Sequence, residues 1–242
     1  MTVTLLVTRP RPAADEFADW ARQRLDPDIA VLVSPVMRIE PAGGELLPLD
    51  GVAALVVTSR HAIAALQAAP GAAGRPCYCV GTATARAARA AGLDAIDAGG
   101  TAAALERRLL ADAPPGPIVY ARGAHIASDL VQNLSRAGLA VCDSVVYHQL
   151  PEPLTAAARA VLAGNAPVIL PLFSPRSARL LFDAVTPAAP LFVAAISDKV
   201  ASAIPRATQL TIARNPDAGA MLDCIEGIAS QAKRVESGRA SK

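Results

Sequence analysis

The chain has 242 residues, of which 52% are hydrophobic, 3% aromatic and 18% charged, and its formal net charge is +2. At about 150 residues per domain, this length predicts one or two domains with buried cores. The small net charge excludes a broad basic surface for nucleic acid, and no apolar run reaches the ~18 residues that a membrane-spanning helix needs.

Apolar, strand-like segments alternate with alanine-rich, helix-like segments along the chain. The first segment, MTVTLLVTRP, has no charged n-region and no long hydrophobic region, so we expect a strand there and not a signal peptide. The predicted strands are 3–8, 30–34, 52–58, 77–81, 117–121, 143–148, 167–173 and 191–196, and the predicted helices are 12–25, 60–68, 83–90, 102–112, 125–136, 153–163, 175–184, 198–204 and 217–230. This alternation is typical of parallel sheets covered by helices.

Segments of the first half resemble segments of the second half in the sequence. VVTSRHAIAAL (56–66) resembles PLFSPRSARLL (171–181), CVGTATARAA (79–88) resembles AISDKVASAI (195–204), and LLVTRPRPAADEF resembles PIVYARGAHIASDL. The offsets are 174 − 59 = 115 from Ser59 to Ser174, 197 − 81 = 116 from Gly81 to Ser197, and 122 − 9 = 113 from Arg9 to Arg122. Nearly constant offsets of this length predict two similar domains and not a solenoid.

Two Pro-rich, extended segments, 35–48 and 149–153, occupy corresponding places in the two halves. A chain that crosses between domains at both segments makes one domain discontinuous. We therefore expect a first α/β domain formed by 1–36 plus 153–230, a second formed by 37–152 with the linker strands, and a cleft between them. The C-terminal SQAKRVESGRASK is polar and lacks an apolar period, so we predict a disordered tail at 231–242.

The four cysteines and three histidines show no spacing that is typical of a metal site. Cys77 and Cys79 lie two residues apart, which on a strand places both side chains on one face, and we expect buried, inert thiols. We therefore expect no metal and a reducing compartment, the cytoplasm.

The segment CYCVGTATARAARAAG (77–92) places one glycine and two threonines where a predicted strand ends and a helix begins. Ligands of open parallel sheets bind beyond the carboxyl ends of the strands, where helix N-termini present N–H groups to anionic oxygens. Gly81 would allow close approach of phosphate or carboxylate, and Thr82 and Thr84 would hydrogen-bond it. A simple N-cap role for Thr82 fits equally well. GxGxxG, GxxxxGK[ST] and GxSxG do not occur in the sequence, which argues against dinucleotide, NTP and hydrolase sites.

Other predicted strand ends carry hydroxyl, arginine or glycine residues where helices begin. They are Thr8-Arg9-Pro10, Thr58-Ser59-Arg60, Ala121-Arg122-Gly123 and Phe173-Ser174-Pro175-Arg176. A single arginine of this kind is usually a surface residue, but four together predict a cleft that binds several anions. Tyr147 ends the apolar part of SVVYHQ, and it is either a core residue with its hydroxyl at the surface or a member of this site.

The ordered set VTRP, VVTSRHAI, CVGTATARAARAAG, SVVYHQLPEP and LFSPRSARLLF resembles the uroporphyrinogen-III synthase family over residues 3–230. The resemblance implies two flavodoxin-like, parallel-sheet α/β domains joined by a two-stranded linker, with the active site in the cleft. It implies a monomeric enzyme without metal or organic cofactor. Its reaction would cyclise hydroxymethylbilane, with loss of water and inversion of ring D, to uroporphyrinogen III. It leaves open a transient contact with hydroxymethylbilane synthase.

The resemblance also assigns roles to residues. Tyr147 matches the tyrosine of the family's Val-Tyr segment, and we expect its phenol to hydrogen-bond the leaving hydroxyl. The resemblance assigns Thr58, Ser59, Gly81, Thr84 and Ser174 to carboxylate binding, and we add Arg9, Arg60, Thr82, Arg122, Gly123, Arg176 and Lys199 to this group from their position and chemistry.

One segment departs from the family pattern. The second-half counterpart of Gly-x-x-Thr-Ala has Ser197 at the glycine position and Val200 at the threonine position, so a hydroxyl is missing and Lys199 offers a cation instead.

Two other functions stay open. A non-catalytic two-lobed anion- or tetrapyrrole-binding protein would bind without turnover, and a nucleotide-dependent α/β enzyme would use the Gly81 turn without the usual phosphate fingerprints.

Overall fold

The computed structural model describes residues 2–43, 49–125 and 129–240. The chain divides into two compact units: unit 1 is Met1–Arg38 with Leu150–Lys242, and unit 2 is Ile39–Gln149. The chain therefore passes between the units twice, once within the Pro-rich segment 35–48 and once within 149–153. Within the described ranges, no helix is long and apolar enough to cross a membrane.

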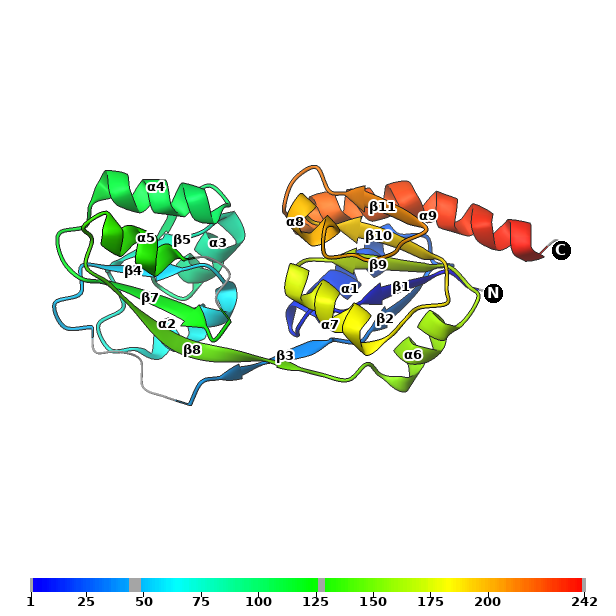
Figure 1. Cartoon of the computed structure of the whole chain (residues 1–242), viewed down its shortest axis with the longest axis horizontal. Helices are drawn as coiled ribbons and strands as arrows, with labels where there is room; N and C mark the ends of the chain where they lie inside the picture. The colour runs from blue at the N-terminus through cyan, green and yellow to red at the C-terminus, as the bar shows by residue number, and fades with distance from the viewer. Residues whose placement is uncertain (1, 44–48, 126–128, 241–242) are drawn as a thin grey trace. The chain divides into compact units, whose positions relative to one another are not determined.

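Unit 1 contains a five-stranded parallel sheet with the order β11-β10-β9-β1-β2 (Figure 1). Its strands are β1 (Thr4–Val7), β2 (Ala30–Val33), β9 (Val168–Leu172), β10 (Leu191–Ala195) and β11 (Gln209–Ile212). In the register, Thr4 of β1 lies opposite Ala30 of β2 and Val168 of β9. Counted within the unit, this is the 2-1-3-4-5 order of flavodoxin-like sheets, whose switch point lies between β1 and β9.

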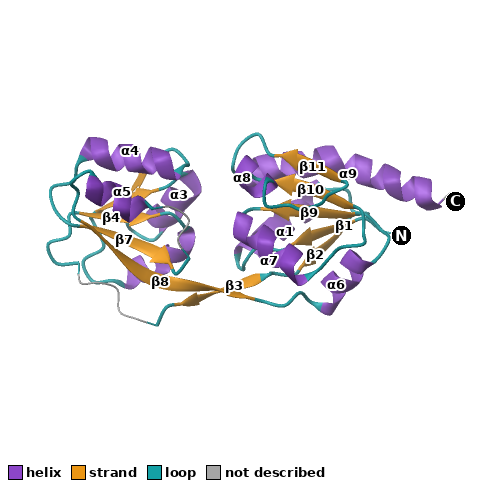
Figure 2. Ribbon diagram, viewed as in Figure 1, coloured by secondary structure: helices purple, strands orange, loops and turns teal. Residues whose placement is uncertain are grey.

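Helices cover both faces of this sheet, as Figure 2 shows. They are α1 (Ala13–Arg24), α6 (Ala156–Ala163), α7 (Pro175–Ala184), α8 (Asp198–Ala201) and α9 (Ala218–Ala240). Helices α1 and α9 pack on one face around Phe17, and the other three pack on the opposite face around Leu181. Strand β1 supplies Leu5 to the first cluster and Leu6 to the second, because successive side chains of a strand point to opposite faces.

Helix α9 extends to Ala240, so the prediction of a disordered tail at 231–242 is wrong for 231–240, and 241–242 lie outside the described residues. The apolar stripe continues beyond the predicted helix end, because Ala232 is fully buried and Val235 packs against the same cluster. Lys233 also forms an ion pair with Asp26. Tertiary contacts with α1 and its following loop thus stabilise a segment whose polarity indicated disorder.

The second sheet has six strands in the order β3-β8-β7-β4-β5-β6. They are β3 (Met37–Pro41), β4 (Ala54–Val57), β5 (Pro76–Cys79), β6 (Asp94–Asp97), β7 (Ile118–Gly123) and β8 (Val141–Pro151). The five strands from β8 to β6 pair in parallel. One face carries the 3-10 turn η1 (Arg60–Ala62), α2 (Ile63–Ala68) and α3 (Thr82–Ala90), and the other carries α4 (Ala102–Asp112) and α5 (Leu130–Arg136).

Strands that the sequence repeat matched occupy matching places in the two sheets. β7 matches β1, β4 matches β9 and β5 matches β10, and the sheets contain the series β7-β4-β5 and β1-β9-β10 in the same spatial order. The order of these strands along the chain differs between the units. In unit 1, β1 comes first and is followed by β9 and β10, whereas in unit 2 its counterpart β7 comes last, after β4 and β5. The predicted α/β class with two parallel sheets is confirmed.

β3 and β8 are neighbours at the edge of this sheet: β3 lies in the Pro-rich linker segment 35–48, and β8 contains the predicted strand 143–148 and the start of the linker segment 149–153. Ala42 N–H donates to Val146 O and Glu152 N–H donates to Val36 O, so the two strands run antiparallel. β3, β6 and β11 were absent from the predicted strands, because each has only four or five residues and carries polar side chains.

Candidate functional site

The carboxyl ends of β4 and β7 lie at one edge of the unit 2 sheet, where Tyr147 of β8 is opposite the end of β7. β4 leads into η1 and α2 on one face, whereas β7 precedes α5 on the other face, so the switch point of this sheet lies between β4 and β7. Ligands of open α/β sheets bind beside such a point. Thr58 and Ser59 follow β4, Gly123 ends β7, and Tyr147 on β8 contacts both Ser59 and Gly123.

Tyr147 is 7% exposed and lies in the core cluster covered by α2 and α3. Its ring centroid lies 5.7 Å from that of His61, and its side chain hydrogen-bonds Ser59. Burial raises the pKa of the Tyr147 phenol, and the hydrogen bond with Ser59 offsets this only in part. The phenol therefore keeps its proton at neutral pH and is able to donate a hydrogen bond.

Tyr120 is a candidate that the sequence analysis missed. Its hydroxyl lies 2.8 Å from Oγ1 of Thr58, while its ring is buried in the cluster covered by α4 and α5. Burial raises the pKa of Tyr120, so this phenol stays neutral well above physiological pH, and its hydroxyl orients that of Thr58. The available signal was a tyrosine two positions before Arg122 in PIVYARG, near the carboxyl end of a predicted strand.

Arg122 lies at the same edge, but other protein groups engage its guanidinium. Its Nε donates to Oδ2 of Asp143 on β8, and its Nη1 donates to Gly123 O at 2.9 Å. The Arg122 side chain is only 15% exposed. This arginine ties β7 to β8, which is a different role from the carboxylate binding that its position predicted.

At the Gly81 turn, the structure shows a packing contact within the chain, whereas the sequence predicted close approach of a ligand. A Cβ on Gly81 would lie 2.9 Å from Gly100 Cα, so packing within the chain by itself requires glycine there. Gly81 occupies the N-cap position of α3, so the N-cap alternative for Thr82 is wrong. The Thr82 hydroxyl instead hydrogen-bonds the Asp97 carboxylate, and Thr84 is buried in the first turn of α3.

In unit 1, the equivalent switch point lies between the ends of β1 and β9. The guanidinium carbon of Arg9 lies 4.0 Å from the ring centroid of Phe173, a cation–π contact. Ser174 caps α7 and accepts a hydrogen bond from Ser177 N–H at 3.0 Å. Thr8 Oγ1 is buried and has no hydrogen-bond partner among the residues that the structure describes.

The remaining predicted cations lie in first turns of helices. Arg60 begins η1, and Arg176 lies in the first turn of α7, where burial lowers the pKa of its guanidinium. Lys199 is exposed on α8, and Ser197 is the N-cap of that helix. Val200, which replaces the threonine of the family pattern, is 1% exposed and fills the core of unit 1.

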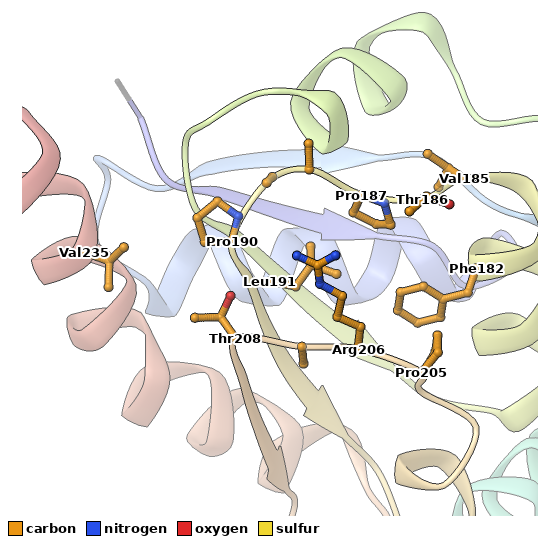
Figure 3. A pocket seen from close by; sticks show the side chains of 13 residues that line it. Phe182, Val185, Thr186, Pro187, Pro190, Leu191, Pro205, Arg206, Thr208 and Val235 are labelled. Atoms are coloured by element: carbon orange, nitrogen blue, oxygen red, sulfur yellow. The ribbon is translucent and has the colours of Figure 1, made fainter.

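A cavity of about 420 Å³ lies at the other edge of the unit 1 sheet. Figure 3 shows Phe182, Pro190, Leu191, Arg206 and Thr208 around it. Pro190 directly precedes β10 and Thr208 directly precedes β11, so the cavity adjoins the amino ends of these strands. It is therefore separate from the strand-end residues singled out above.

The cysteines are free, and Cys77 and Cys79 both face the core covered by α2 and α3, so the expected burial on one face is confirmed. Among the described residues, no group of three His, Cys, Asp or Glu side chains is arranged to hold a metal ion.

Comparison with known proteins agrees with this architecture. A family model described as uroporphyrinogen-III synthase HemD matches residues 20–223. The structure is similar to uroporphyrinogen-III synthetase from Helicobacter pylori 26695, with a TM-score of 0.67 and 19% identity over 94% of this chain and 100% of that one. It is also similar to a mutant uroporphyrinogen III synthase from the extremely thermophilic bacterium Thermus thermophilus, with a TM-score of 0.54 and 16% identity over 96% and 100% of the two chains. No match was found among curated proteins.

Proposed function

This chain belongs to the uroporphyrinogen-III synthase family, and from that premise we propose how its residues serve the reaction. The family activity is that of a cyclising lyase acting on a small molecule. We propose that the substrate is hydroxymethylbilane, which loses water and closes to uroporphyrinogen III with inversion of ring D. Expulsion of the hydroxymethyl oxygen as water leaves an azafulvene cation, which attacks the substituted carbon of ring D to form a spiro intermediate. Fragmentation and reclosure then invert the ring.

The strand-end residues have the chemistry that such a substrate needs. Hydroxymethylbilane carries an acetate and a propionate on each pyrrole, and hydroxyls, guanidinium groups and helix N-termini bind carboxylates without a large net positive charge. We assign the carboxylate contacts to Thr58, Ser59, Arg60 and Thr84 in unit 2, and to Arg9, Ser174, Arg176 and Lys199 in unit 1. We leave out Arg122 and Thr82, because their side chains bind Asp143 and Asp97, and Gly81, because packing against Gly100 already explains its lack of a side chain.

Tyr147 is the residue to which we assign the chemistry. The observation that carries this assignment is a buried, neutral phenol beside Ser59 at the switch point of the unit 2 sheet. A neutral phenol donates a hydrogen bond to the departing hydroxyl and so assists the loss of water. The enzyme's larger task is to hold the bilane in the folded conformation that favours inversion, because the uncatalysed bilane closes without it.

A product-isomer assay tests the proposal. Hydroxymethylbilane would be generated in situ, the protein added, and the oxidised uroporphyrins separated by chromatography. We expect type III to dominate. Type I alone, formed at the spontaneous rate, together with a binding isotherm for the bilane, would favour the non-catalytic tetrapyrrole-binding alternative instead.

We also propose that the protein acts as a cytoplasmic monomer that makes a transient contact with hydroxymethylbilane synthase. Sedimentation equilibrium should give the mass of one 24.8 kDa chain. Dilution of a coupled assay separates transfer through contact from free diffusion, because a free intermediate is lost to type I closure as both enzymes are diluted.

A further inference from the structure

The pairing of β7 with β8 contains a β-bulge beside Tyr147. Arg122 lies opposite Val145, but the next residue, Gly123, lies opposite Tyr147, so Val146 is an extra residue on β8. In a regular strand, neighbouring side chains point to opposite faces. Here Val146 and Tyr147 both enter the cluster covered by α2 and α3, while Val145 is 36% exposed. The bulge therefore redirects the tyrosine, as bulges beside functional sites do.

Gly123 lies directly against the redirected ring. A Cβ at this position would lie 2.6 Å from both Cε2 and Cζ of Tyr147 and 2.9 Å from its hydroxyl oxygen, distances that real Cβ atoms do not reach. The φ angle of Gly123 is outside the left-handed region, so the backbone conformation alone does not demand glycine. What demands glycine is the position of the phenol ring.

Three contacts fix the backbone on which the ring rests. Arg122 binds Asp143 on β8 and, through Nη1, the carbonyl oxygen of Gly123 at 2.9 Å. Beyond the bulge, Ala124 N–H donates to Tyr147 O at 3.0 Å. Neither Gly123 nor the β8 backbone can therefore move away from an added methyl group without breaking these bonds, so the ring would have to move.

We propose that Gly123 is a positioning residue whose missing side chain seats the Tyr147 ring and aims its hydroxyl at the reacting oxygen of the substrate. This role replaces the carboxylate contact that the sequence predicted for Gly123. The proposal rests on the proposed function of Tyr147. The position of the Tyr147 ring against Gly123, however, is a property of the free protein and is measurable without substrate.

The test compares Gly123→Ala with Gly227→Ala, a control in α9 where a Cβ would meet nothing within 4 Å. Tyrosine labelled with ¹³C at Cζ gives one NMR signal for each of the three tyrosines, and Tyr147→Phe assigns the signal of Tyr147. Displacing the ring into solvent removes the burial that raises its pKa, so in Gly123→Ala this signal should titrate at lower pH than in wild type. The control should leave it unchanged. An unchanged titration in Gly123→Ala would show that Gly123 does not position the Tyr147 ring and would overturn the proposal.

Kinetics then separate positioning from substrate contact. Gly123→Ala should lower kcat about as much as Tyr147→Phe, about 100-fold, with a smaller change in KM. Added to Tyr147→Phe, it should cost less than about threefold more, because the phenol is already absent. Losses that multiply would mean that Gly123 contacts the substrate, contrary to the proposal. If the NMR titration shifts in Gly123→Ala but the wild-type protein forms no type III product, the proposed function is refuted, whereas the positioning of the Tyr147 ring by Gly123 is supported.

A stability cycle keeps the proposal testable if Gly123→Ala does not fold. The same substitution in a Tyr147→Ala background meets no ring, so it should leave the Tm of that background nearly unchanged. A large loss of Tm in both backgrounds would contradict the proposal, because the clash would then not be with Tyr147.

Discussion

At Tyr147, the pKa decides which chemistry the side chain is able to perform. Its phenol is neutral at pH 7, as an ordinary tyrosine is, and burial outweighs the hydrogen bond with Ser59 and raises its pKa further, so it acts as a hydrogen-bond donor and not as a base. Burial also raises the pKa of Tyr120, whose hydroxyl bonds Thr58. Two neutral phenols therefore flank the β4 end, where the sequence analysis expected one.

Replacing Tyr147 with phenylalanine removes the proposed donor and keeps the ring. We expect kcat to fall about 100-fold with KM changed much less, because the hydrogen bond forms as the hydroxyl leaves. The share of type III isomer among the products should remain above the spontaneous background, since the other contacts still fold the bilane. Tyr78→Phe, on the opposite face of the sheet, is the matched control. Full kcat in Tyr147→Phe would refute the assigned role.

Among the elements, β5 and α4 are joined by a short polar network. The Tyr78 hydroxyl donates to Oδ2 of Asp112 at 3.0 Å, and Nε of Arg108 donates to the same oxygen at 2.7 Å. Burial and this hydrogen bond raise the pKa of Tyr78 to about 12. In the unfolded chain, the same phenol loses its proton near pH 10.

This difference predicts how stability changes at alkaline pH. The folded state retains the Tyr78 proton longer than the unfolded state, so its contribution is complete below about pH 10 and is lost as the pH rises toward 12. Tyr78→Phe should cost about 1 kcal/mol at pH 7 and should flatten the decline between pH 10 and 12. Urea unfolding at several pH values measures both effects, and an equally steep decline in the variant would contradict the prediction.

The C-terminal part of α9 is the element whose stability the sequence analysis underestimated. Arg24 on α1 binds Asp223 and Glu226 on α9, and Ala232 is buried beyond the predicted helix end at 230. Surface ion pairs add little, so burial is the main stabilising term here.

Ala232→Asp should therefore lower the free energy of unfolding by about 2–4 kcal/mol, because it places an unpaired carboxylate in the unit 1 core. Gln231→Asp, one residue earlier at a half-buried position, should cost much less. Chemical denaturation of both variants decides the matter. Equal, small losses would mean that 231–240 contributes nothing to folding, as the original prediction of a disordered tail implied.

At the scale of the whole molecule, each unit has its own sheet and its own cores on both faces. Unit 2 is continuous, whereas unit 1 is assembled from the two ends of the chain. A compact unit with a complete core should fold by itself.

We accordingly expect a fragment of residues 39–149 to unfold in one cooperative urea transition and to show a dispersed NMR spectrum. The fragment should bind no bilane tightly, since it lacks the unit 1 residues proposed as carboxylate ligands. A featureless, non-cooperative transition would show that the unit needs the rest of the chain.

Strand periodicity and the internal repeat determined much of this architecture, because buried parallel strands must be apolar on both faces and because repeated segments take the same place in a repeated fold. Short strands with polar residues, such as β6 and β11, gave too little periodicity to be recognised. The ordered motifs also identified the family.

Only the tertiary structure decided what individual strand-end residues touch. Gly81 is glycine because Gly100 lies against it, Arg122 binds Asp143, and Gly123 lies under Tyr147. Each of these partners is distant in sequence, and local spacing carries no record of such contacts. The sequence by itself therefore determined the fold class and the family, whereas packing between separate strands and turns decided which hydroxyls, arginines and glycines remain available to a ligand.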